Sequence, residues 1–180
     1  MQDLSLHLLD IAENSIRARA KKIIIELNEA ISNNKLSLKI SDDGEGMSQQ
    51  MIQIITNPFV TIRTTRRVGL GIPLLYQNCL NAGGTLEIHS VLGKGTVIEA
   101  VMQYNHIDRL PVGDMASSLI ALIQGNPYME FIYTHVYENK TFIFNTSEIK
   151  QVLGAVAINE PEIIQWLKSY IAGYIASLYR

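Results

Sequence analysis

The sequence predicts an α+β protein with a larger first unit and a small C-terminal extension. Helical spacing of apolar residues and the alternation typical of strands follow one another along the chain, and 47% hydrophobic with 18% charged residues suits a folded core. Asn105, Pro111 and Gly113 cluster after the last strand expected in the first half, which indicates a boundary there. We therefore expect one unit over residues 1–104 and an α+β extension over residues 105–180.

The first unit is expected to begin with a helix and a strand. Leu6, Leu9 and Ile16 recur at helical spacing, so residues 4–20 should form a helix. A β-branched run predicts a strand over residues 21–28. The further elements expected here are a loop over 28–34, a half-buried strand through Leu36, Leu38 and Ile40, a helix over 49–56 capped by Ser48, a loop over 57–68, a helix opened by Gly69-Leu70-Gly71 and stopped by Gly83-Gly84, and strands over 85–91 and 96–103.

The extension is expected to hold a helix, an aromatic hairpin and two more helices. Asn159 with Glu162 three residues later predicts a capping box at the start of the last helix. The apolar stripe of that helix is wide, which gives two compatible interpretations: the extension packs on the first unit, and it presents a dimer or partner surface. The expected elements are a helix over 114–124, strands over 128–137 and 140–145, and helices over 147–153 and 160–179.

Composition excludes several classes of partner. The net charge of −2 and the pI of about 6.1 give no general attraction for nucleic acid or anionic membranes. A single cysteine, Cys79, cannot form an internal disulfide, which is typical of a reducing compartment. The N-terminus is acidic where a signal peptide would be cationic, and no apolar tract approaches the roughly 20 residues that a bilayer requires. We expect a cytoplasmic protein without nucleic-acid or membrane partners.

A first motif lies on the expected N-terminal helix. Asp10 and Asn14 are one turn apart on one helix face, and His7 lies one turn earlier. The side-chain oxygens of Asp10 and Asn14 could act together in a site. The same spacing also occurs on the solvated face of an ordinary amphipathic helix, so the later motifs decide between the two interpretations.

A second motif follows the strand that contains Ile40. It reads Asp42-Asp43-Gly44-Glu45-Gly46-Met47, and its glycines allow the backbone to turn and to approach a ligand closely. A plain acidic turn is the simplest alternative. A calcium loop of the EF-hand type is excluded, because its alternating ligands and distal glutamate are missing.

The third motif spans residues 57–71 and is basic. It carries Arg63, Arg66 and Arg67 and ends in Gly69-Leu70-Gly71, where the free N–H groups of a helix start can meet anionic oxygens. An exposed basic loop is the alternative. A Walker A run and a dinucleotide fingerprint are both absent from the sequence.

The fourth motif, Gly93-Lys94-Gly95-Thr96, would alone be an ordinary hairpin turn. In this order, the four motifs resemble the N, G1, lid and G2 boxes of the GHKL (Bergerat-fold) ATPases, which include sensor histidine kinases, DNA gyrase, MutL and the ninety-kilodalton heat-shock chaperones. The resemblance covers about residues 5–103. It implies a two-layer α/β sandwich of Bergerat type, with a mixed sheet, helices on one face, and Mg-ATP held between Asp42 and the lid.

The resemblance also implies roles for single residues. Asn14 matches the asparagine that holds Mg²⁺, and Asp10 occupies the position of a glutamate general base but is one methylene shorter. Asp42 matches the aspartate that accepts a hydrogen bond from the adenine amino group. The other matching residues are Gly44 and Gly46 for close backbone approach, Met47 for packing on adenine, Thr96 for the adenine edge, and Arg63, Arg66, Arg67, Gly69, Leu70 and Gly71 for the phosphates.

The function implied is that of a regulatory ATP-binding protein. The first box begins within ten residues of Met1, which leaves no room for a phosphoacceptor segment, so the layout is similar to that of the anti-sigma serine kinases. We expect an ATPase or a kinase-like phosphotransferase that hydrolyses ATP slowly or passes its γ-phosphate to a protein partner. The alternatives are a non-catalytic ATP sensor that switches a protein interface, in which Asp10 is too short to act, and a binding subunit with a vestigial pocket. A protein partner or a homodimer is expected.

Overall fold

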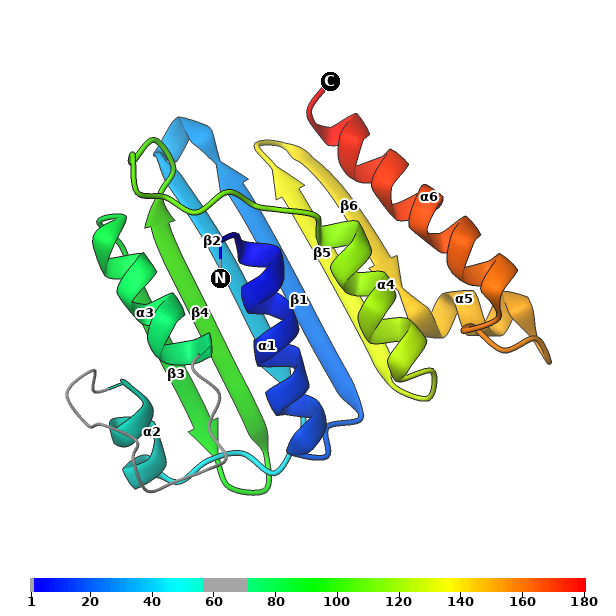
Figure 1. The fold of residues 1–180 in the computed structure, drawn as a ribbon, viewed down its shortest axis with the longest axis horizontal. Helices are drawn as coiled ribbons and strands as arrows, with labels where there is room; N and C mark the ends of the chain where they lie inside the picture. Colours follow the sequence, from blue (N-terminus) through cyan, green and yellow to red (C-terminus); the bar gives the residue numbers. More distant parts are fainter. Residues whose placement is uncertain (1, 57–70) are drawn as a thin grey trace.

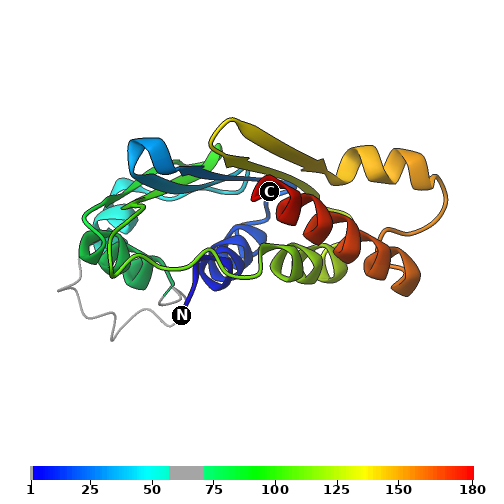
Figure 2. The same cartoon turned by 90° about the horizontal axis from the view of Figure 1, so that it is seen from above.

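A computed structural model of the chain describes residues 2–56 and 71–180. Within these residues, six strands form one mixed sheet in the order β3-β4-β2-β1-β5-β6 (Figure 1). Figure 2 shows α1, α3, α4 and α6 together on one side of this sheet. The expected α+β architecture, a sheet layer under a helix layer, is therefore confirmed. No helix of the described part of the chain is long and apolar enough to span a bilayer.

The elements of the first part alternate much as the sequence predicts. They are α1 (Leu4–Arg17), β1 (Lys22–Ala30), η1 (Ile31–Asn33), β2 (Lys35–Asp42), α2 (Gln49–Thr56), α3 (Gly71–Asn81), β3 (Thr85–Val91) and β4 (Gly95–Gln103). The expected cap of α2 is confirmed, because the Met51 N–H donates to Ser48 Oγ at 3.3 Å.

Two expected boundaries are wrong. The first helix ends at Arg17 and not at residue 20, because Arg19 adopts a left-handed conformation with φ of 59°. Strand β1 continues to Ala30 where a loop was expected from residue 28. Pairing explains the longer strand, since β1 is hydrogen-bonded along this length to β2 on one side, from Ile23↔Asp42 to Ala30↔Lys35.

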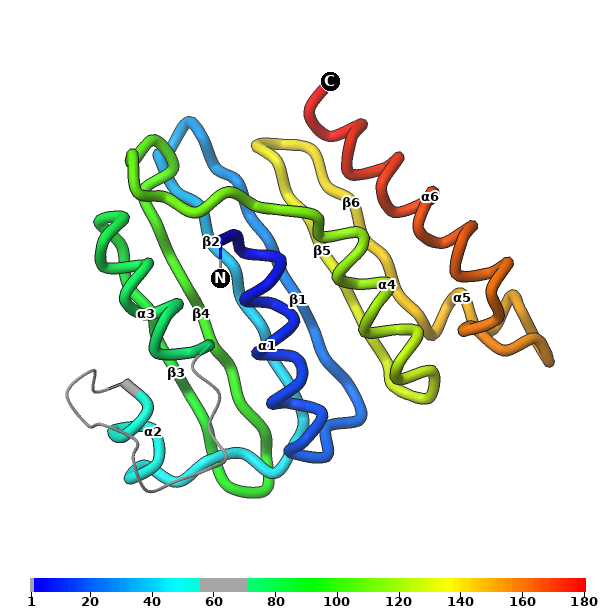
Figure 3. The backbone as a smooth tube through the Cα atoms, viewed as in Figure 1, coloured from blue at the N-terminus to red at the C-terminus, as the bar shows by residue number. Residues whose placement is uncertain are grey.

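The C-terminal part extends the same sheet. Strand β5 (Glu130–Tyr137) pairs in parallel with β1, and β6 (Lys140–Asn145) pairs antiparallel with β5. The backbone trace in Figure 3 shows this hairpin beside β1, although about a hundred residues separate β5 from β1 in the chain. The remaining elements are α4 (Met115–Gly125), α5 (Thr146–Leu153) and α6 (Pro161–Leu178), and α4 contacts both α1 and α6.

The predicted capping box of the last helix is wrong. Glu160 is the N-cap of α6, its side chain makes no capping hydrogen bond, and Pro161 occupies the first turn. Proline fixes φ and needs no partner for an N–H, so it starts a helix without side-chain capping. Asn159 therefore lies outside the helix.

Alternating side chains of the central strands build the core. Ile23, Ile25 and Leu27 of β1 are fully buried toward the helices, as are the apolar residues of β2. The intervening residues face the other side of the sheet, where Lys39 and Glu26 form a partly exposed ion pair at 3.3 Å. The period of two seen in the sequence thus divides a buried face from a partly solvated face.

Glu29 breaks this pattern, because it is a carboxylate buried on the helix side of β1. His135 Nε2 lies 2.8 Å from Glu29 Oε1, the Tyr179 hydroxyl donates to the same oxygen, and the Tyr104 hydroxyl donates to Oε2 at 3.3 Å. His135 Nδ1 is in turn 2.9 Å from the Tyr133 hydroxyl. Burial alone would raise the pKa of Glu29, but the hydrogen bonds from His135 and Tyr179 outweigh it and hold the pKa below its ordinary value. This network fastens the end of α6 to the sheet.

Replacing Glu29 by glutamine should lower the free energy of unfolding at pH 7 by about 2–4 kcal/mol, because a buried imidazole and two hydroxyls lose their charged acceptor. Urea unfolding followed by circular dichroism measures this change. Glu26→Gln on the same strand is the matched control, since its ion pair is partly exposed and should contribute less than about 1 kcal/mol. Equal effects of the two substitutions would contradict the assigned role of Glu29.

The contribution of Glu29 should also depend on pH. Its pKa is lower in the folded state than in the unfolded chain, where the pKa of glutamate is about 4.3. The stabilisation is therefore fully present above that pH and is lost as the pH falls further, through the folded-state pKa. The difference in unfolding free energy between wild type and Glu29→Gln should be constant between about pH 6 and pH 7 and should shrink below about pH 4.

Candidate functional site

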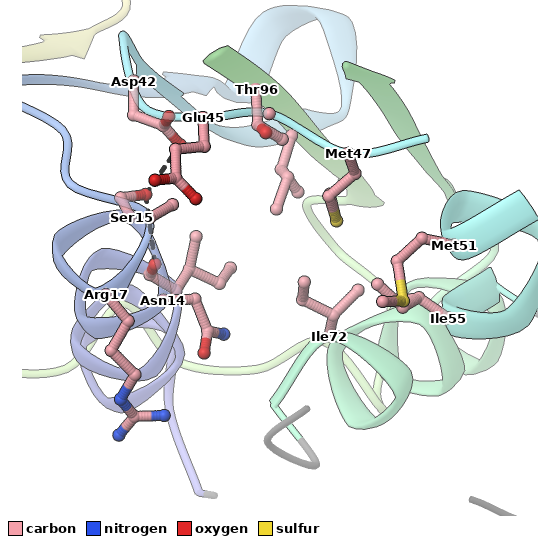
Figure 4. Close-up of a pocket in the computed structure, with 14 residues that line it drawn as sticks. Asn14, Ser15, Arg17, Asp42, Glu45, Met47, Met51, Ile55, Ile72 and Thr96 are labelled. Carbon is pink, nitrogen blue, oxygen red and sulfur yellow. Dashed lines mark hydrogen bonds between the residues drawn. The ribbon is translucent and has the colours of Figure 1, made fainter. Parts of the chain in front are cut away.

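A cavity of about 350 Å³ opens where β2 ends (Figure 4). Helix α1 forms one wall, α2 and α3 form the opposite wall, and the ends of β2 and β4 close the top of the view in Figure 4. The lining residues are Ile11, Asn14, Ser15, Arg17, Ala18, Asp42, Glu45, Gly46, Met47, Met51, Ile55, Ile72, Thr96 and Ile98. The first, second and fourth sequence motifs thus meet at one place.

Asp42 is the last residue of β2 and is held from two sides. The Gly44 N–H donates to Asp42 Oδ1 at 2.9 Å, and the Ser15 hydroxyl donates to Asp42 Oδ2 at 2.8 Å. A carboxylate has about four lone-pair sites, so further acceptor capacity remains toward the cavity. Ser15 comes from α1, and its bond ties the helix wall of the cavity to the sheet.

The neighbouring Asp43 has a structural role. Its Oδ1 accepts hydrogen bonds from the N–H groups of Lys21 and Lys22 at 2.7 and 2.9 Å. Burial alone would raise its pKa, but these backbone donors hold the pKa below the ordinary value. Of the two adjacent aspartates, Asp42 lines the cavity and Asp43 fastens the chain before β1.

Glycines allow the loop after β2 to lie against the β3–β4 turn. The Gly93 N–H donates to the Glu45 carbonyl oxygen at 2.8 Å. A Cβ on Gly46 would collide with the Val91 carbonyl oxygen, and a Cβ on Gly95 would collide with the carbonyl oxygen of Asp42. Gly95 also has a φ of 106°, which side chains rarely adopt. These two contacts of backbone on backbone fix the sheet end of the cavity.

Gly44 and Met47 complete this loop. Gly44 is buried against Ala18, whose carbonyl oxygen lies 2.8 Å from a Cβ built on that glycine. The Met47 side chain lines the cavity, and its backbone N–H donates to Ser90 Oγ at 2.7 Å. Ser90 is also 2.8 Å from the hydroxyl of Thr96, which is buried and lines the cavity.

Asn14 and Asp10 occupy different surroundings although they share a helix face. Asn14 lines the cavity, and its buried Nδ2 has no hydrogen-bond partner among the described residues. Asp10 lies outside the set of described residues that line the cavity. Its buried Oδ2, also without a partner in the described part of the chain, packs against Gly71 at the start of α3.

His7 lies one turn before Asp10 and is fully buried. Its Nε2 is 3.1 Å from Asn78 Nδ2 of α3, and burial lowers its pKa below the ordinary value. A neutral imidazole in this position joins α1 to α3 through a hydrogen bond. The structure therefore gives His7 a packing role beside the site.

The residues present suit an aromatic base and a magnesium ion. The walls contributed by Ile11, Met51, Ile55, Ile72 and Ile98 are apolar, and Asp42 and Thr96 provide polar atoms at the sheet end. An apolar cleft with a few converging polar groups is typical of small-molecule sites. Asn14 lines the cavity, and its side-chain amide carries an oxygen of the kind that Mg²⁺ prefers.

The structure does not place every residue expected at the site. Arg63, Arg66, Arg67, Gly69 and Leu70 lie outside the described residues, and Gly71 is buried at the start of α3. Ser15, Ser90 and the apolar wall residues were not predicted. Ser15 directly follows Asn14 in the sequence, but a serine there gives no signal until the distance to Asp42 is known.

Arg17 and Glu45 also line the cavity without having been assigned to it. Arg17 is exposed and pairs with Glu13 at 3.0 Å, and in Figure 4 its guanidinium points away from the cavity. Glu45 pairs with Arg19 at 3.4 Å. Exposed pairs of this kind contribute little to stability, so both side chains can reorient at small cost.

Comparisons with known proteins find similarity over the part of the chain that contains this cavity. The model of the histidine kinase-, DNA gyrase B- and HSP90-like ATPase family matches residues 2–106. Sporulation kinase C of Bacillus subtilis is 29% identical over 94 residues, which cover 52% of this chain and 22% of that kinase. A sensor-like histidine kinase of Rhizobium meliloti is 33% identical over 96 residues, which cover 51% of this chain and 18% of that protein. The chain thus spans about a fifth of the length of these relatives.

Among solved structures, the N-terminal domain of a DNA repair protein aligns with a TM-score of 0.54 and 19% sequence identity. The alignment covers 86% of this chain and 58% of the other. This likeness concerns the fold alone. It extends beyond residue 106, where the family match ends, so the similarity in fold includes part of the C-terminal extension.

Gly95→Ala should lower the free energy of unfolding by about 2–4 kcal/mol, because the new Cβ meets the Asp42 carbonyl oxygen and φ is unfavourable. Gly93→Ala is the control. Gly93 also has a positive φ, of 77°, but a Cβ there would meet nothing within 4 Å, so the cost should be about 1 kcal/mol. Urea unfolding of the two variants measures the difference, and equal losses would show that the loop does not depend on close approach at Gly95.

Proposed function

Because the chain belongs to the family of histidine kinase-, DNA gyrase B- and HSP90-like (GHKL) ATPases, we propose that it binds Mg-ATP in the cavity at the end of β2. We propose further that it hydrolyses ATP slowly or transfers the γ-phosphate to a protein partner. The family match supports ATP binding. The site residues, the reaction and the partner are our proposal, together with a cytoplasmic location.

The placement of Asp42 carries this proposal. Its carboxylate is fixed at the sheet end of the cavity by Gly44 and Ser15, and it faces the space that a base would fill. A fixed acceptor selects a ring that carries an amino group over one that carries a carbonyl in the same place. Met47 and the isoleucines provide apolar surface for the faces of such a ring.

At the other end of the cavity, Asn14 would hold Mg²⁺ through its side-chain oxygen. When bound, the ion neutralises phosphate charge and so makes the γ-phosphate easier to displace. Asp10 would accept a proton from the attacking water or hydroxyl group. Gly71 opens α3 close to Asp10, and the N-terminus of that helix favours anionic groups nearby.

A non-catalytic ATP sensor is the second candidate, and the position of Asp10 favours it. The Asp10 carboxylate packs against Gly71 and lies outside the described cavity lining. A side chain shorter than glutamate reaches less far from α1. In this second proposal, ATP changes a surface that contacts a partner protein or a second copy of the chain, and no phosphate is transferred.

Calorimetry with ATP, with and without Mg²⁺, tests the binding proposal. Wild type should bind Mg-ATP, and Asp42→Asn should weaken binding by roughly 30- to 150-fold, because a charged acceptor is replaced by an amide that also presents a donor. Asp43→Asn is the matched control and should change binding by less than about threefold, because Asp43 fastens the backbone outside the cavity. Failure of folded wild type to bind ATP would overturn the proposal.

ADP release under saturating ATP separates the two candidates. If the chain is an ATPase, Asp10→Asn should reduce the slow turnover by roughly 10²-fold while ATP binding persists, because a general base contributes about that factor. Glu13→Gln, one position from Asn14 and paired with exposed Arg17, should leave turnover unchanged. No turnover by wild type, and no label transfer to a co-purifying protein, would favour the sensor.

A further inference from the structure

Three polar groups from two segments, the loop after β2 and the start of β4, converge on the buried hydroxyl of Ser90. The Met47 N–H lies 2.7 Å from Ser90 Oγ, the Gly95 carbonyl oxygen 2.9 Å, and Thr96 Oγ1 2.8 Å. Ser90 and Thr96 are both buried and face each other near the end of the β3–β4 pair. A hydroxyl with three partners at these distances has no freedom to rotate.

Counting hydrogens gives the direction of each bond. A serine hydroxyl has one hydrogen to donate and two lone pairs to accept. The Gly95 carbonyl can only accept, so it takes the hydrogen of Ser90. The Met47 N–H can only donate, so it occupies one lone pair of Ser90. Thr96 must then donate its own hydrogen to the second lone pair.

This arrangement sets what Thr96 offers to a ligand. With its hydrogen committed to Ser90, the Thr96 hydroxyl presents only lone pairs to the cavity. Asp42 is the direct cross-strand neighbour of Thr96 in the β2–β4 pair and is also an acceptor. The carboxylate is fixed by donors from Gly44 and Ser15. The polar end of the cavity therefore carries two acceptors on adjacent strands.

We propose that Ser90 is a positioning residue that fixes Thr96 as an acceptor, so that Thr96 and Asp42 together take the two hydrogens of a primary amino group on the base. This inference rests on the proposed function, because it concerns how the same cavity selects its nucleotide. The ligand is the adenine nucleotide of the proposed function, which carries an amino group at position 6. A base without that group leaves both acceptors unpaired, which costs affinity.

Ser90 could instead be only a structural tie between the loop after β2 and the β3–β4 turn. Loss of such a tie would loosen the cavity for every nucleotide equally. The two roles therefore differ in the ratio of affinities for two ligands, which a general loosening does not change. ATP and purine riboside 5′-triphosphate form a suitable pair, since they differ only in the amino group at position 6.

Calorimetry with both ligands is performed on folded wild type, Ser90→Ala and Thr96→Val. Wild type should prefer ATP by roughly 10²-fold. In Ser90→Ala this preference should fall by about tenfold, because the freed Thr96 hydroxyl can turn its hydrogen into the cavity, while affinity for the purine analogue changes by less than about threefold. Ser90→Thr, which keeps the hydroxyl, should retain the wild-type preference.

Thr96→Val keeps the Ser90 contacts with Met47 and Gly95 and tests the proposal even if Ser90→Ala does not fold. It should lower the preference for ATP by at least as much as Ser90→Ala, and adding Ser90→Ala to it should change the preference no further. An unchanged preference in Thr96→Val, additive effects in the double variant, or equal weakening of both ligands by Ser90→Ala would each overturn the inference. Failure of wild type to bind either ligand would overturn the proposed function itself.

Discussion

The site depends on the close approach of two backbone segments, the loop after β2 and the β3–β4 turn. Gly46 lies against Val91, Gly95 lies against Asp42, and the Gly93 N–H donates to the Glu45 carbonyl. This approach needs residues without a Cβ, which is why glycines recur on both segments. It brings Asp42 beside Thr96 and places Ser90 within reach of Met47. The approach of these two main-chain segments thus brings the polar groups at the sheet end of the cavity together.

The C-terminal extension is joined to the site through β1. Strand β1 pairs with β2, which ends at Asp42, and on its other side it pairs in parallel with β5. The buried carboxylate of Glu29, near the far end of β1, holds Tyr179 after the last helix. The extension therefore completes the sheet on which the site is built, and its removal would leave one side of β1 without hydrogen-bond partners.

The sequence could predict the parts of this structure that local runs of residues encode. Asp42 with Gly44 and Gly46 forms such a run, and alternation of apolar and polar residues located most strands. The addition of β5 beside β1 could not be predicted, because parallel neighbours are not joined by a tight turn that marks the pairing. The role of Ser90 depends on Met47, 43 positions away, and becomes visible only with distances. Asn159 gave a wrong helix start because Pro161 satisfies the same requirement without a cap.

The two sides of the cavity are held by different forces. Asp42 and Thr96 sit on paired strands, whose ladder of hydrogen bonds resists displacement. Met51, Ile55 and Ile72 come from α2 and α3, which are held by side-chain packing. Packing contacts are individually weak and non-directional, so they yield before a ladder does. The sheet side of the cavity is therefore the more firmly held of the two.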